Sequence, residues 1–268
     1  MDEKEQRSEE GALGQYLTAR VSRARLLATG AGLALAVLPA SAAADGSSQT
    51  GRLEFPFFPP VKGTYTPESI QDILNILDTA ERLLVAIHTA AATTYAGQLA
   101  FSPLALSIVQ ASLAQEQYHV DFLESIGARS LVDSFAVRSV QLTNRAVYLQ
   151  AMVGVGTIYT AAYMTAAREF AEVGQPTLVK YAYQIGATKS EHGVLGRTLL
   201  ALGGTSSAVP PNNNAFEPDQ YLYVRDFYSY LASRGYFGTN DTPVPYLGRA
   251  AALAAAGPMA SAVSQTTP

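Results

Sequence analysis

Proline and glycine divide the middle of this chain into four long stretches, each with the three- and four-residue apolar spacing of an amphipathic helix. Thr66 before Pro67 and Ser102 before Pro103 each offer an N-cap oxygen followed by a proline at the first helical position. Glycine after the second, third and fourth stretches favours helix termination. The expected helices cover residues 68–100, 103–126, 144–173 and 176–202.

The remaining segments show no alternating strands of useful length and no βαβ unit, and residues 128–143 are expected to contain short helical pieces. The sequence therefore predicts an all-α fold: an antiparallel four-helix bundle over residues 67–204, with N- and C-terminal extensions. In the C-terminal extension, 205–268, we expect one Tyr-rich helix at 217–233. The Ala-rich tail after Gly248 is expected to be poorly ordered.

Residues 1–44 have the pattern of an export signal peptide: a basic start, an apolar run and a cleavage region of small residues near Ala43 or Ala44. The alternative is an uncleaved membrane anchor, which the Ala, Gly and Pro39 of the run disfavour. An extended Pro-rich segment follows at 45–66. The sequence predicts export to the periplasm, cell surface or extracellular space, without a stable membrane span after cleavage, and leaves the Sec or Tat route open.

Composition excludes several classes of function. The net charge of −4 and the lack of a Lys/Arg stripe argue against nucleic-acid binding. Without cysteine, the chain has no disulfide, thiolate metal site or cysteine nucleophile. No catalytic triad order, phosphate loop or nucleotide fingerprint occurs. A homo-oligomer stays open, and the sequence names no specific partner.

Ionisable side chains interrupt the apolar pattern inside three of the expected helices. Glu116 and His119 are three residues apart and therefore lie on nearly the same face of the second helix. Glu81 lies in the middle of the apolar first helix, and His192 in the interior of the fourth. Carboxylates and imidazoles buried in a helical core need hydrogen-bonding partners or a metal ion.

The chain resembles the secreted ferritin-like domain family, the desiccation-related protein type, over residues 73–215. The resemblance rests on "ILNILDTAE", "QEQYHVDFL", "AAYMTAA" and "SEHGVLGR" in the four helices and on "PPNNNAFE" after them. In such bundles two helices each give one glutamate and two each give Glu-x-x-His to a pair of metal ions. The resemblance implies that Glu81, Glu116, His119 and His192 are candidate metal ligands.

Two of the four expected carboxylates are missing. The glutamate of the third helix would fall near Gly156, and Lys189 stands three residues before His192. A lysine ammonium among the ligands repels metal ions and pairs with carboxylates. We therefore expect Lys189 to replace the metal as an internal counter-ion. The alternatives are one ion held by the four candidates, with Glu191 as a less favoured fifth ligand, and a Lys189 that lies on the surface.

These residues favour a non-catalytic structural, binding or stress-protective role, with no cofactor expected, over enzymatic activity. The alternative is an oxidase- or ferroxidase-type enzyme that uses iron or manganese at the retained half-site. A third hypothesis is a small-molecule binder, because Gly154, Gly156 and Gly186 could leave room in the core. Tyr159 and Tyr163 are expected to fill the space of the missing glutamate or to bond a glutamate.

Overall fold

The computed structural model describes residues 66–132, 134–204 and 215–264, and their regular secondary structure is helical apart from one short pair of strands. The four long helices are α3 (Ile70–Ala92), α5 (Pro103–Ser125), α7 (Arg145–Glu172) and α8 (Pro176–Leu202). The short ones are α4 (Ala96–Leu99), α6 (Val140–Thr143), α9 (Val224–Ser233), α10 (Arg249–Ala256) and α11 (Met259–Ala262). The expected export signal lies outside the described residues, as does all of the Pro-rich segment except Thr66. The all-α class is confirmed.

Side-chain capping fixes three of the four long-helix starts. Ser102 and Asn144 accept hydrogen bonds from backbone N–H groups three residues ahead, which fixes the starts of α5 and α7. The first helix starts later than expected, because Ser69 rather than Thr66 is its cap and accepts the Asp72 N–H. It also ends earlier, at Ala92, and the short α4 follows.

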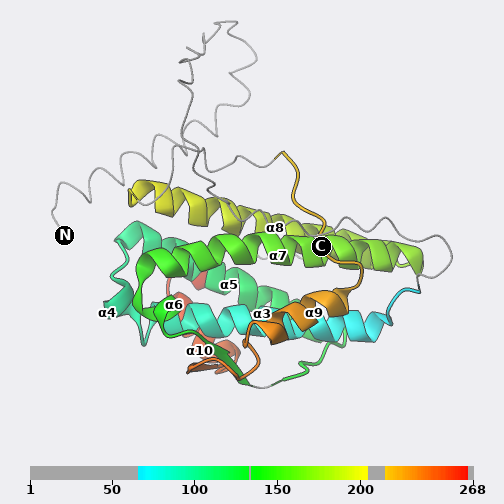
Figure 1. The fold of residues 1–268 in the computed structure, drawn as a ribbon, viewed down its shortest axis with the longest axis horizontal. Helices are drawn as coiled ribbons and strands as arrows, with labels where there is room; N and C mark the ends of the chain where they lie inside the picture. The colour runs from blue at the N-terminus through cyan, green and yellow to red at the C-terminus, as the bar shows by residue number, and fades with distance from the viewer. Residues whose placement is uncertain (1–65, 133, 205–214, 265–268) are drawn as a thin grey trace, which may run out of the picture. The chain divides into compact units, whose positions relative to one another are not determined.

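The long helices lie alongside one another as antiparallel neighbours (Figure 1). Contacts between α3 and α5 run in opposite chain directions: Gln71 bonds the carbonyl of Gly127, and Glu81 meets His119. α8 runs back along α7 in the same way after the turn at residues 173–175. Because each helix buries one face against its neighbours, the core residues collect between these helices.

Glycine brings α7 and α8 unusually close. A Cβ atom added at Gly156 would lie 2.6 Å from the Cα of Gly193 and 3.0 Å from the carbonyl oxygen of Lys189. At Gly186 the neighbouring atom is the Cβ of Tyr163, at 3.1 Å, whereas Gly154 has nothing within 4 Å. These distances show close backbone packing at Gly156 and not room for a ligand, so the space expected there does not exist.

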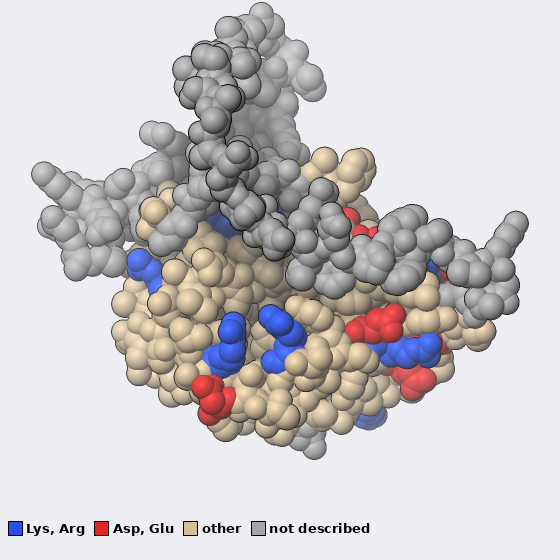
Figure 2. All heavy atoms as spheres, in the orientation of Figure 1, with Lys and Arg blue, Asp and Glu red and all other residues tan. Residues whose placement is uncertain are grey.

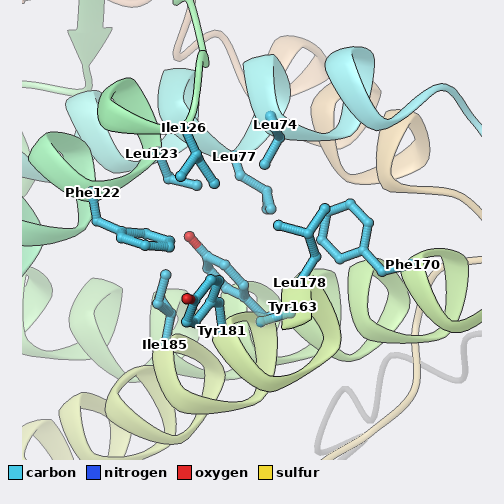
Figure 3. A pocket seen from close by; sticks show the side chains of 11 residues that line it. Leu74, Leu77, Phe122, Leu123, Ile126, Tyr163, Phe170, Leu178, Tyr181 and Ile185 are labelled. Atoms are coloured by element: carbon cyan, nitrogen blue, oxygen red, sulfur yellow. The ribbon is translucent and has the colours of Figure 1, made fainter. Parts of the chain in front are cut away.

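A small apolar hollow lies elsewhere among the same helices (Figure 3). Leu77 of α3, Phe122 of α5, Tyr163 of α7 and Ile185 of α8 all line it. Its lining includes no charged side chain. A ligand site needs convergent polar groups to orient its ligand, and this hollow offers only two tyrosine hydroxyls.

The segments outside the four long helices differ from expectation. Residues 128–143 contain α6 but also the strand β1 (Ser134–Val137), which pairs antiparallel with β2 (Thr242–Pro245). The Ala-rich tail is ordered through residue 264, because Ala252 and Ala256 of α10 are buried with apolar residues of α5 such as Leu113. The expectation of a poorly ordered tail is therefore wrong for these residues.

The Tyr-rich helix exists as α9, but it begins at Val224 and not at residue 217. The buried carboxylate of Glu169 explains this start, since it accepts the backbone N–H of Val224 at 3.0 Å and that of Glu68, also at 3.0 Å. One acid in α7 thus holds the start of α9 beside the segment that leads into α3.

None of the described helices combines the length and the apolar character needed to cross a membrane. On the face shown in Figure 2, lysine, arginine and acidic side chains are few, and both signs are interspersed among uncharged residues.

The contrast between two glycines of α7 gives a direct test of the close packing. We expect Gly156→Ala to destabilise the fold by about 1–3 kcal/mol, the usual cost of overpacking a core. Gly154→Ala is the matched control and should stabilise by roughly 0.5–1 kcal/mol, because alanine is the better helix former and nothing blocks its methyl group. Urea unfolding measures both, and equal effects of the two substitutions would contradict the packing described.

Candidate functional site

Four ionisable side chains from three helices meet in the core. The ammonium Nζ of Lys189 lies 2.5 Å from Oε2 of Glu81 and contacts Oε2 of Glu116. It is also 3.3 Å from Nδ1 of His119. The side chains of Lys189, Glu81 and Glu116 are 0% exposed. The structure therefore brings together three of the four candidate ligands and the lysine, with the ammonium between the carboxylates.

The two histidines flank Glu116 on different sides. Nδ1 of His119 is 3.1 Å from Oε2 of Glu116 and 3.3 Å from Oε2 of Glu81, and its side chain keeps 15% exposure. Nδ1 of His192 lies 3.0 Å from Oε1 of Glu116, within ion-pair distance but without hydrogen-bond geometry. The other ring nitrogen of His192 bonds Gln115 at 2.7 Å. His119 is thus the most solvent-accessible of these groups.

Tyrosines of α7 complete the surroundings of the cluster. The hydroxyl of Tyr163 donates to Oε1 of Glu81 at 2.7 Å. Tyr159 donates to the carbonyl of Ala80 at 2.9 Å, and the Lys189 ammonium lies 5.5 Å from its ring centroid. That distance allows a cation–π attraction. The expectation for Tyr163 as a phenol bonded to a glutamate is confirmed, while Tyr159 is satisfied by backbone.

The positive and polar groups of the cluster stabilise the ionised form of Glu116. Burial alone would raise the pKa of Glu116, but the Lys189 charge, with His192 and His119, holds it well below the usual value of 4.5. Burial and Lys189 lower the pKa of His119, but its bonds to Glu116 and Glu81 outweigh them and raise it. Glu116 therefore stays ionised, and its charge is neutralised by protein groups.

A metal ion does not fit these residues as they are arranged. Glu81, Glu116 and His119 offer ligand atoms that all lie within 4.8 Å of one another, which is compatible with a shared ion. However, the ammonium of Lys189 already contacts both carboxylates and approaches the His119 nitrogen. An ion there would have to displace a buried cation and coexist with its charge. His192 is not part of that three-residue group.

Other polar residues and Gly156 take structural positions. Glu191 is exposed on α8, as expected of a surface acid. His88 is buried against Tyr148, with 2.5 Å between Nδ1 and the hydroxyl, and burial lowers its pKa to about 4. Gly156 faces the backbone of α8, so the α7 side chains that reach the cluster are those of Tyr159 and Tyr163.

Two polar residues near the site were missed by sequence reasoning. Gln115 holds His192 and directly precedes Glu116 in "QEQYH", so its adjacency was an available signal. Asp78 is buried one turn before Arg82 and accepts a hydrogen bond from Nε of Arg82 at 2.9 Å. Burial raises the pKa of Asp78 to about 6, against the opposing effect of Arg82. Its position inside the apolar pattern of α3 could have indicated burial.

Comparison with known proteins finds no similar protein-family model, no similar curated protein and no similar solved structure. The resemblance to secreted ferritin-like proteins therefore rests on the sequence motifs alone.

Lys189→Met tests how much the fold depends on the buried ammonium. Methionine keeps the apolar stem of the side chain but removes the ammonium and leaves Glu81 and Glu116 unpaired in the core, so we expect a loss of about 3–5 kcal/mol in unfolding free energy. The double variant Lys189→Met/Glu116→Gln removes one charge of each sign and should cost less than the sum of the single changes. Additive costs in chemical denaturation would contradict the coupling.

The depressed pKa of Glu116 predicts a specific acid sensitivity. A carboxylate with a lowered folded-state pKa contributes stability that is present above its unfolded pKa, near 4.5, and is lost as the pH falls through the folded pKa. We expect the wild type to lose stability more steeply below pH 4.5 than Glu116→Gln, whose amide does not titrate. Parallel acid limbs for the two proteins would show that Glu116 is not stabilised as described.

Proposed function

We propose that this chain is an exported ferritin-like four-helix bundle with a non-catalytic structural or stress-protective role, in which Lys189 has replaced the metal centre. The observation that carries the proposal is the position of the Lys189 ammonium, which contacts Glu81 and Glu116 where a metal would bridge them. Antiparallel contacts between neighbouring long helices support the bundle. The signal-like start supports export.

The lysine gives the bundle independence from metal supply. A carboxylate-rich core without a cation would be destabilised by repulsion between Glu81 and Glu116, and ferritin-like centres neutralise it with metal ions. Here a covalently attached cation supplies that charge, so chelators cannot remove it. The chain also lacks cysteine and so does not depend on redox conditions. Both properties suit a protein that persists outside the cell.

Two positions, one on α7 and one at residue 189, lack the carboxylates that a two-metal enzyme would need. Tyr159 and Tyr163 of α7 stand near the cluster without a carboxylate, and Lys189 stands where the Glu-x-x-His pattern requires an acid. The second candidate, an iron or manganese oxidase, is favoured by the compact group of Glu81, Glu116 and His119. It requires the wild-type chain to hold metal despite the lysine, and the next experiment measures that metal binding.

Metal binding distinguishes the two candidates through Lys189→Glu, which restores Glu-x-x-His on α8. The wild type, exposed to Fe²⁺ or Mn²⁺, should retain well under one ion per chain after desalting, and its melting temperature should not change. The apo variant should be less stable, since it adds a carboxylate to two others, and divalent metal should raise its melting temperature.

Elemental analysis and thermal unfolding with and without metal give both readouts. One or two ions retained per wild-type chain, with a rise in melting temperature, would overturn the proposal and support the metal-dependent alternative. Calcium serves as the control for nonspecific binding to carboxylates, because it prefers more oxygen ligands and no histidine.

A further inference from the structure

The outward side of α8 carries a stripe of exposed residues that the proposed function does not use. Lys180, Gln184, Ala187 and Glu191 follow one another at spacings of four, three and four residues, and all are exposed. Such spacing places them along one line of the helix surface. Tyr183, beside this line, is 75% exposed, which is unusual for a large aromatic side chain. These five residues form what we call the α8 outer stripe.

A second exposed aromatic side chain lies beside α8. Ser190 of α8 bonds Glu217 at 2.8 Å, and this contact brings the neighbouring Phe216, which is 91% exposed, to the same helix. Two exposed aromatic side chains on one helix face mark an interaction surface more often than isolated ones do.

The charges of the stripe are self-complementary under two-fold symmetry. Lys180 and Glu191 lie at its two ends, eleven residues or about 16 Å apart along the axis. If two copies of α8 cross antiparallel about the midpoint between residues 185 and 186, Lys180 of each copy meets position 191 of the other. Gln184 then faces position 187, where the small Ala187 permits close approach. Within the described residues, neither Lys180 nor Glu191 has an ion-pair partner of its own.

We infer that the α8 outer stripe binds a second copy of this chain and forms an isologous antiparallel dimer. The same patch serves on both subunits, as a two-fold interface requires. Tyrosine is well suited to such a contact, because it buries a large rigid surface and keeps a hydroxyl for a polar rim. The inference concerns a face opposite to the buried cluster and holds with or without metal there.

Reversing the charge of Lys180 or of Glu191 tests the dimer. Lys180→Glu places two glutamates at each end of the interface and Glu191→Lys places two lysines there, so each change should raise the dimer dissociation constant about tenfold or more. The double variant Lys180→Glu/Glu191→Lys restores opposite charges at both ends and should return to near the wild-type value. Arg138→Glu, an exposed change of the same charge on the loop between β1 and α6, is the control and should have no effect.

Analytical ultracentrifugation of the full exported chain over a range of concentrations measures the association. A wild type that stays monomeric at all concentrations would overturn the inference, as would a dimer that the single variants leave unchanged. Weakening by both single variants without recovery in the double variant would rule out the antiparallel register. Circular dichroism confirms folding of each variant, since all the altered residues are exposed.

Discussion

The contact of the Lys189 ammonium with Glu81 and Glu116 is the interaction on which the core depends. Two carboxylates with no exposure repel each other unless a cation lies between them, and the cost of an unpaired buried charge exceeds that of most single contacts. The lysine joins α8 to both α3 and α5. A buried salt bridge is not in itself strongly stabilising, but its geometry specifies how those three helices align.

The packing of α7 agrees with this arrangement. Gly156 and Gly193 let α7 and α8 approach until no side chain fits between them, so residue 156 cannot send a ligand into the core. Tyr163 takes up one free oxygen of Glu81, and the ring of Tyr159 lies beside the ammonium. Replacing Lys189 by glutamate would therefore add a carboxylate from α8, while α7 would still offer the cluster only Tyr159 and Tyr163.

Sequence reasoning reached the parts of the structure that local chemistry determines. Prolines 103 and 176 predicted two helix starts, and the spacing of Glu116 and His119 predicted their shared face. The sequence predictions were wrong where contacts between residues far apart in the chain determine the structure. The Ala-rich tail looks disordered by composition, yet Ala252 is buried against α5. The start of α9 combines a local bond, from the Tyr223 N–H to Asp226, with a bond to Glu169, which lies 55 residues earlier and has no local signature.

The most direct measurement is a crystal structure of the wild-type protein grown with Mn²⁺, with diffraction recorded at a wavelength where manganese scatters anomalously. We expect no anomalous peak between Glu81 and Glu116, and density for the Lys189 side chain reaching both carboxylates. A peak within about 2.0–2.3 Å of those carboxylate oxygens, with Lys189 turned away, would contradict it.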